Sequence, residues 1–207
     1  MVETYSQAHQ DLFVLWMTKS KKSGSFLEIG ANHPSQGGNN TYLLEKNYDW
    51  NGLMIEYDKQ FAPLYEQIRP RSKYIIGDAR NIDYVEALKP FPSVLHYLQI
   101  DLDVNNRSSL DVLERLDQTV FDSYTFATVT FEHDIYTGDY FSTRSKSREI
   151  FAKRGYILIF PDVCVYLNGN WVPFEDWYVY PDSVRSDFST MKTDQSMKSV
   201  DISNKFI

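Results

Sequence analysis

Residues 25–32 read SFLEIGAN, a short apolar run that ends in a glutamate, a glycine and an asparagine. The run favours a buried strand, and Gly30 favours a tight turn after it, because glycine lets the backbone bend and approach a ligand closely. The GxGxxG spacing of dinucleotide-binding proteins is absent, since Asn32 stands where the second glycine would be. The segment predicts a strand followed by a ligand-binding turn, with an ordinary βα turn as the alternative.

Apolar runs like this one recur about every 20 to 30 residues, which is the spacing of βα units. The expected strands are 25–30, 52–56, 73–76, 95–101, 126–132, 156–160 and 171–180. The last of these contains Pro173 and therefore predicts an edge or hairpin strand. Helical spacing of apolar residues appears between the runs, at 7–18, 61–68, 108–116 and 143–154. Together the pattern predicts an α/β fold, a mostly parallel sheet with helices on both faces and right-handed crossovers.

Length and composition favour one domain spanning 1–207, since 207 residues with 43% hydrophobic content can build one sizeable core. We expect the core to cover about 6–180 and the polar segment 182–207 to form a loose extension. The one cysteine, Cys164, excludes an internal disulfide framework and any CxxC motif. No apolar run approaches the roughly 20 residues of a membrane span, and the N-terminus does not resemble a signal peptide. These features predict a soluble, cytoplasmic protein.

Charge bears on the partners. The 21 basic and 28 acidic residues give a formal net charge of −7. Broad electrostatic attraction to nucleic acid or to an anionic membrane is therefore not expected. Aromatic residues make up 15% of the chain, enough to fill a core or to line a pocket for a ring-shaped ligand. The aromatic residues expected near the ligand are Tyr57, Tyr136, Tyr140, Trp171 and Trp177.

An acidic residue closes nearly every expected strand. In a doubly wound sheet, ligands bind beyond the carboxyl ends of the strands, so these side chains should meet at one edge. Glu28 lies at the end of the first strand, Glu56 could accept hydrogen bonds from ribose hydroxyls, and Asp78 would face a purine. Each alone could be a solvated strand end, but in combination they favour a nucleoside-containing cofactor.

A second acidic group lies in Asp101-Leu-Asp103 and Glu132-His133-Asp134. If the fourth and fifth strands are neighbours, two carboxylates and an imidazole would come together, which suits Mg²⁺ or Mn²⁺. Such a cation would lower the pKa of a bound hydroxyl, and Asp103 could take its proton. The predicted metal ligands are therefore Asp101, Glu132 and His133. The alternative is an ion-paired loop in which His133 only donates hydrogen bonds.

The strand ends and the segments around them resemble FkbM-type methyltransferases, class I enzymes that use S-adenosylmethionine. The resemblance runs from about Ser6 to Tyr180, through SQAHQD, FLEIGAN, NNTYLLEK, GLMIEYD, IIGDA, LQIDLDVNNRSSLDVLERL, TVTFEHD and FEDWYVYP. It implies a Rossmann-like, seven-stranded sheet with one antiparallel strand, and methyl transfer to oxygen. The family's loop after the first strand commonly reads Asn-Asp-Gly, whereas here it reads Asn32-His33-Pro34.

The resemblance also implies roles for individual residues. The set expected at the cofactor is Gln7, Glu28, Gly30, Asn32, Asn40, Glu56, Tyr57, Asp78, Ala79 and Asp101. The catalytic residues expected are Asp101, Asp103 and His133, and those expected at the acceptor are Asp103, Asp134 and Tyr136. The acidic residues after the fourth and fifth strands also resemble the metal centres of Mg²⁺-dependent sugar and catechol O-methyltransferases.

The functional hypothesis is metal-assisted O-methylation of a vicinal diol on a sugar or glycan. The acceptor would be a small molecule or a glycan, and the chain could belong to a larger glycan-modifying protein or pathway. A nicotinamide-dependent oxidoreductase is one alternative, disfavoured by the absence of GxGxxG. A non-catalytic cofactor- or glycan-binding module is the other.

Overall fold

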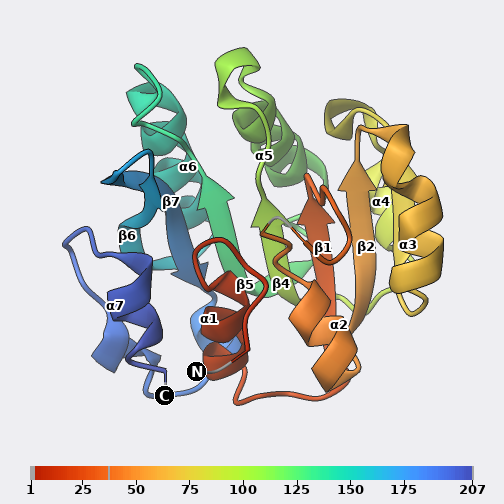
Figure 1. The fold of residues 1–207 in the computed structure, drawn as a ribbon, viewed down its shortest axis with the longest axis horizontal. Helices are drawn as coiled ribbons and strands as arrows, with labels where there is room; N and C mark the ends of the chain where they lie inside the picture. The colour runs from red at the N-terminus through yellow and green to blue at the C-terminus, as the bar shows by residue number, and fades with distance from the viewer. Residues whose placement is uncertain (1–2, 37, 207) are drawn as a thin grey trace.

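A seven-stranded sheet forms the centre of the computed structural model, which describes residues 3–36 and 38–206 (Figure 1). The strand order is β3-β2-β1-β4-β5-β7-β6. The strands are β1 (Ser25–Ile29), β2 (Asn51–Glu56), β3 (Lys73–Ile76), β4 (Val94–Ile100), β5 (Thr125–Glu132), β6 (Ile157–Leu167) and β7 (Asn170–Val179). Strands β1 to β5 pair in parallel, whereas β7 is antiparallel to both of its neighbours. The predicted α/β class, parallel sheet and single antiparallel strand are confirmed.

Helices cover both faces of this sheet. They are α1 (Gln10–Met17), α2 (Tyr42–Tyr48), α3 (Ala62–Ile68), α4 (Tyr84–Leu88), α5 (Ser108–Thr119), α6 (Phe141–Lys153) and α7 (Ser199–Ser203). Short 3₁₀ turns lie at Lys59–Phe61, Ala79–Asn81, Val104–Asn106, Pro181–Ser183 and Phe188–Met191. Among the described residues, no helix is long and apolar enough to cross a membrane.

Two apolar cores lie on opposite faces of the sheet, because successive strand residues point to opposite sides. Phe26 packs with α1, α2, α3 and α7, while the next residue, Leu27, packs with α4, α5 and α6. Met54 and Ile55 on β2 divide in the same way. Every strand in the middle of the sheet is therefore buried on both faces, which explains why these strands read as continuous apolar runs.

The β6–β7 hairpin departs most from the expected boundaries. Strand β6 continues to Leu167, past Pro161 and past Asp162, which has a positive φ of 49°. The register of β6 against β7 shifts three times in this stretch. These irregularities let the strand continue through residues at which the sequence predicts that it ends. Pro173 does lie in a hairpin strand, but β7 is inside the sheet and β6 forms the edge.

The C-terminal segment is not the loose extension predicted from its polar composition. Helix α7 packs Ile202, which is fully buried, into the core on the α1 face. The backbone joins the edge of the sheet, where Cys164 N donates to Met197 O at 2.8 Å and Thr193 N donates to Ile159 O at 3.1 Å. A few apolar anchors and backbone hydrogen bonds therefore order a mostly polar stretch.

Truncating one anchor tests this packing. Ile202→Ala should lower the free energy of unfolding by about 2–4 kcal/mol, because it leaves a cavity in the core. Val200 lies in the same helix but is 39% exposed, so Val200→Ala should cost less than about 1 kcal/mol. Urea denaturation of the two variants gives the comparison. Equal losses would show that α7 is not anchored through Ile202.

Candidate active site

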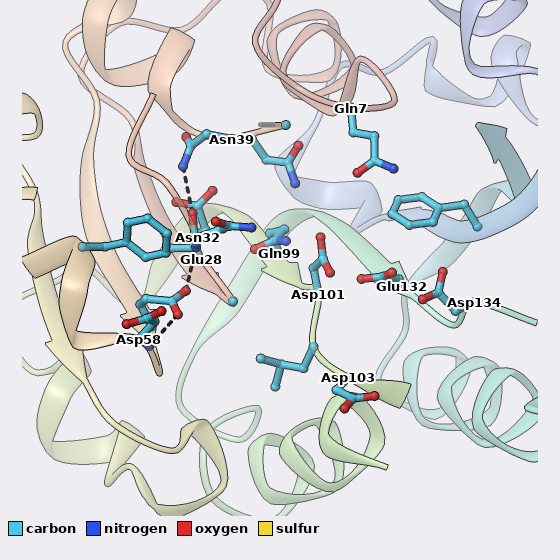
Figure 2. A pocket seen from close by; sticks show the side chains of 18 of the residues that line it. Gln7, Glu28, Asn32, Asn39, Asp58, Gln99, Asp101, Asp103, Glu132 and Asp134 are labelled. Atoms are coloured by element: carbon cyan, nitrogen blue, oxygen red, sulfur yellow. Dashed lines mark hydrogen bonds between the residues drawn. The ribbon is translucent and has the colours of Figure 1, made fainter. Parts of the chain in front are cut away.

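Two adjoining cavities open at the carboxyl ends of the parallel strands. The larger has a volume of about 710 Å³ and is lined by residues that follow β1, β2, β4 and β5, together with Gln7 and Phe174 (Figure 2). The second has a volume of about 440 Å³ and lies over the turns after β2, β3 and β4. Leu102 and Asp103 line both cavities. One elongated ligand could therefore occupy both.

The turn after β1 brings backbone against backbone. Gly30 has a φ of 83°, and a Cβ added there would come within 1.8 Å of the carbonyl oxygen of Asp101. Gly30 N donates to Ile55 O at 3.0 Å, and Asp101 N donates to Ile29 O at 3.0 Å. Only glycine fits between these strands without displacing them.

A fully buried arginine holds the loop that follows this turn. Arg69 Nε donates to Glu45 Oε2 at 2.8 Å, and Arg69 Nη2 donates to Thr41 Oγ1 at 2.7 Å. Its Nη1 donates to Pro34 O at 3.2 Å and to Asn39 Oδ1 at 3.3 Å. The guanidinium thereby joins α2, α3 and the wall of the larger cavity. Nothing in the local sequence around position 69 distinguishes this arginine from a surface one.

Glu28 lies under that loop and is 1% exposed. Burial raises the pKa of its carboxyl to about 7, while Arg69 and a hydrogen bond from Thr41 oppose the rise. Thr41 Oγ1 donates to Glu28 Oε2 at 2.7 Å. Since Glu28 already accepts a hydrogen bond from Thr41, it has a structural function, which is to hold the loop against β1 beneath the cavity.

Glu56 connects two turns at the end of β2. Its Oε2 accepts from Asn32 N at 2.7 Å, and its Oε1 accepts from Asp58 N at 2.8 Å. The carboxylate lines the larger cavity, and the next residue, Tyr57, lines the smaller. Carboxylate oxygens can accept further hydrogen bonds. Glu56 could therefore bind hydroxyl groups of a ligand that extends from one cavity into the other.

The smaller cavity has the composition of a ring-binding site. Tyr57 is 77% exposed at its rim, and Ala79 contributes an apolar wall. Asp78 is bound to Arg80, whose Nη2 lies 2.8 Å from Asp78 Oδ2. Hydrogen bonds from Arg80 lower the pKa of Asp78, so this carboxylate stays ionised beside the cavity.

The other end of the larger cavity holds three carboxylates with unmet hydrogen-bonding capacity. Figure 2 shows Asp101, Glu132 and Asp134 there, with Glu28, Asn32 and Asp58 on the opposite side. Burial raises the pKa of Asp101 to about 7, with Asp134, Glu28 and Glu56 adding to the rise. Burial likewise raises the pKa of Asp134 to about 6, against an opposing effect of His133. Charged forms of these groups are thus disfavoured in the absence of a donor or cation.

Asp103 lines both cavities but is tied to its own turn. Its Oδ1 accepts from Asn105 N at 2.9 Å and from Asn105 Nδ2 at 3.0 Å. The backbone NH of Ser108 at the start of α5 also binds this turn, through Asp103 O at 3.2 Å. The side chain predicted to act as base therefore has a structural function in shaping the turn.

His133 does not join Asp101 and Glu132, contrary to the predicted metal set. Its side chain is fully buried, and its Nε2 lies 3.3 Å from Asp162 and 3.5 Å from Asp176. Glu132 and Asp134 line the cavity, whereas the His133 side chain between them lies outside it. Burial would lower the pKa of His133, but Asp162 and Asp176 outweigh it and raise the pKa.

In the described residues, one group of three His, Cys, Asp or Glu side chains has its potential metal-ligand atoms within 4.8 Å of one another, and it consists of His133, Asp162 and Asp176. This group is already paired with guanidinium groups. Arg148 Nε lies 2.7 Å from Asp176 Oδ2, and Arg144 Nη1 lies 3.0 Å from Asp162 Oδ1. The cluster is therefore a charge-balanced junction between β5, β6, β7 and α6.

The remaining predicted residues lie where the sequence suggested a ligand. Gln7, Asn32, Asn40 and Tyr136 line the larger cavity. Of the residues predicted to bind cofactor, metal or acceptor or to act in catalysis, His133 alone lines neither cavity within the part of the chain that the structure describes. Two of the aromatic residues expected near the ligand, Tyr140 and Trp171, also line neither cavity. Trp177 was expected at the rim, but it is fully buried in the core because its position on β7 faces α1.

Sequence reasoning missed Gln99, Asp58 and Phe174, which also line the larger cavity. Gln99 is 2% exposed, and its Oε1 has no hydrogen-bond partner in the described chain. A glutamine inside the apolar run LHYLQI is the signal that could have identified it, since a polar residue in a buried strand needs a partner. Asp58 and Phe174 have no comparable signal.

No family model and no curated protein matches the sequence, so the resemblance to FkbM-type enzymes stays a prediction. Solved structures do match. The methyltransferase domain of METTL16 has a TM-score of 0.58 at 11% identity, over 87% of this chain and 70% of that one. An rRNA methylase from Streptococcus thermophilus has a TM-score of 0.52 at 12% identity, over 87% and 98%.

A TehB-like S-adenosylmethionine-dependent methyltransferase from Corynebacterium glutamicum also matches, with a TM-score of 0.50 at 11% identity, over 83% of this chain and 87% of that one. Identities this low carry the fold and not the substrate. The chain has the fold of class I S-adenosylmethionine-dependent methyltransferases.

Proposed function

We propose that the protein transfers a methyl group from S-adenosylmethionine to a hydroxyl of a small polyhydroxylated acceptor, such as a sugar or a glycan unit. The observation that carries the proposal is the pair of adjoining cavities at the strand ends, which share Leu102 and Asp103. A cofactor with a ring at one end and a charged amino acid at the other fits such a pair.

The residues present fit S-adenosylmethionine. Tyr57 and Ala79 would hold the adenine ring, and Glu56 would accept hydrogen bonds from the ribose. The amino-acid end would lie beside Gly30 and Asn40, and the buried Asn40 Oδ1 has no partner among residues 3–36 and 38–206. A nicotinamide dinucleotide fits less well, because the turn after β1 lacks the glycine spacing that receives a pyrophosphate.

The acceptor end of the cavity supports a neutral or cationic acceptor. Seven carboxylates line the larger cavity: Glu28, Glu56, Asp58, Asp101, Asp103, Glu132 and Asp134. No lysine, arginine or histidine is among its described lining residues. A phosphate-rich nucleic acid would be repelled there, although some proteins of similar fold are RNA methyltransferases.

Asp101 is the residue best suited to receive the proton. It lies between the cofactor side and the acceptor side of the cavity, and its pKa of about 7 suits a base near neutral pH (Figure 2). When bound, S-adenosylmethionine supplies a methyl group on a positively charged sulfur. Transfer of that methyl group to the acceptor oxygen would leave S-adenosylhomocysteine, and Asp101 would take the proton of the acceptor hydroxyl. Gly30 keeps Asp101 close to the cofactor turn.

We propose this step without a divalent cation, because one of the three predicted ligands lies elsewhere: His133 faces Asp162 and Asp176. The one three-residue group with suitable spacing in the described chain is neutralised by Arg144 and Arg148. In the proposed reaction, the carboxylate of Asp101 therefore acts as the base without a cation.

Cofactor binding can be tested at Tyr57, whose exposure makes it unimportant for folding. Tyr57→Ala should weaken binding of S-adenosylhomocysteine about three- to tenfold, because one stacking surface for adenine is lost. Tyr166→Ala is the matched control, since Tyr166 is 61% exposed and lines neither cavity. Calorimetric titration, with NAD as a second ligand, measures both. Tighter binding of NAD, or equal effects of the two variants, would contradict the proposal.

The base can be identified by two isosteric substitutions. With saturating cofactor, sugar acceptors and excess EDTA, the wild-type protein should transfer methyl groups, and Asp101→Asn should lower kcat about 100-fold or more. Asp103→Asn should have a smaller effect, because Asp103 serves its turn. Methyl transfer is followed by product mass. If Asp103→Asn loses as much activity as Asp101→Asn, the base predicted from the sequence, Asp103, is supported instead. If the wild-type protein is active without EDTA but inactive in excess EDTA, the reaction requires a divalent cation.

The pKa of Asp101 also predicts a pH-dependent stability. Its folded pKa of about 7 exceeds the unfolded value of about 3.9, so its contribution is fully present below pH 4 and is lost as the pH rises through 7. Asp101→Asn removes this loss. Relative to wild type, the variant should gain on the order of 2 kcal/mol in free energy of unfolding between pH 5 and pH 8. Urea denaturation at both pH values checks this, and a constant difference would refute the shifted pKa.

A further inference from the structure

The acceptor end of the larger cavity has several hydrogen-bond acceptor atoms that no donor of the described chain reaches. Glu132 is 6% exposed, and its Oε2 has no hydrogen-bond partner in the described chain. The same holds for Asp134 Oδ1 and for Gln99 Oε1. All three side chains line the cavity, and Figure 2 shows Glu132 and Asp134 side by side at its edge. A buried carboxylate oxygen without a donor is costly, so a donor on a ligand is expected here.

The carboxylates on the β1 and β2 side of the cavity already have donors within the protein. Glu28 accepts from Thr41, Glu56 accepts from two backbone NH groups, and Asp58 accepts from Gln60 N. Among the cavity carboxylates, the buried oxygens without a donor in the described chain are therefore those of Glu132 and Asp134. The cofactor's sulfonium and ammonium groups would lie on the β1 side, beside Gly30 and Asp101. They leave Glu132 and Asp134 unbalanced.

The neighbours of Glu132 and Asp134 supply only part of the missing charge: His133 and a hydrogen bond from Tyr136 lower the pKa of Asp134, but burial outweighs them. Across the sheet, Glu132 pairs with Glu175, another acidic residue, whose pKa burial raises well above its usual range. The His133 ring faces Asp162 and Asp176, outside the cavity. Tyr136 and Phe174 complete this end with aromatic surface. Aromatic rings beside two carboxylates are typical of sites that bind an organic cation.

We infer that the acceptor carries a protonated amine, which Glu132 and Asp134 bind while a hydroxyl of the same molecule lies at Asp101. This rests on the proposed methyl transfer for the reaction, but the amine site itself depends only on the cavity. An ammonium group donates three hydrogen bonds, and its positive charge compensates the negative charge of the carboxylates. A neutral hydroxyl donates one hydrogen bond and leaves the negative charge uncompensated. The acceptor class is therefore an amino alcohol, such as an amino sugar.

The test uses pairs of ligands that differ only in an amino group. The full chain, saturated with S-adenosylhomocysteine, is titrated with glucosamine against glucose and with ethanolamine against ethylene glycol. The amine of at least one pair should bind about tenfold or more tightly than its hydroxyl partner at pH 7, as a charge-assisted hydrogen bond to a buried carboxylate predicts. Equal binding within both pairs, or no measurable binding of either amine, would overturn the inference.

Substitutions then locate the amine site. Glu132→Gln and Asp134→Asn should each remove most of the preference for the amine, because they weaken binding of the amine more than binding of its hydroxyl partner. Asp139→Asn is the control, because Asp139 is exposed in the following loop and removes the same charge without lining the cavity. A preference that survives both cavity variants, or that falls equally in Asp139→Asn, would assign it to the general negative field instead.

The cofactor titration separates this inference from the proposed function. If S-adenosylhomocysteine fails to bind but amines are still preferred, the amine site stands and methyl transfer falls. If the cofactor binds and neutral ligands bind as well as amines, methyl transfer stands and the amine site falls.

Discussion

The contact between the turn after β1 and the end of β4 is the constraint on which the rest of the site depends. Gly30 approaches the Asp101 carbonyl so closely that a Cβ there would come within 1.8 Å of it. The backbone is locked on both sides, through Gly30 N to Ile55 O and Asp101 N to Ile29 O. The cofactor turn and the proposed base therefore occupy fixed positions relative to each other. This rigidity is useful for methyl transfer, in which positioning of the acceptor oxygen accounts for much of the rate.

Strand positions and strand ends could be predicted because they depend on local patterns. Parallel strands buried on both faces give apolar runs, and the residue after each run lies at the same edge of the sheet. Most of the predicted site residues line one of the two cavities for this reason. The prediction for His133 was wrong because it treated adjacent residues as sharing one side. Strand β5 ends at Glu132, and in the irregular backbone that follows, Asp134 lines the cavity with Glu132 while His133 faces Asp162 and Asp176 on β6 and β7.

The features that could not be predicted depend on contacts between distant segments. Arg69 is one of several arginines in a polar stretch, and only the fold brings it to Glu45 and Thr41. The C-terminal segment reads as solvated because most of its residues are polar, yet Ile202 and the backbone bonds to β6 order it. Composition averages over a segment, whereas burial of a single apolar side chain can decide its position.

Part of the chain's acidity is concentrated in the larger cavity, whose two sides differ in how their carboxylates are hydrogen-bonded. A net charge of −7 disfavours nucleic acid, but it does not say where the charge lies. The carboxylates on the β1 side are satisfied by hydroxyl and backbone donors, so they shape the site. On the β5 side, one oxygen each of Glu132 and Asp134 has no donor in the described chain. Since burial makes such charge expensive without a partner, the difference between the two sides indicates that the β5 side is built to select its acceptor by charge.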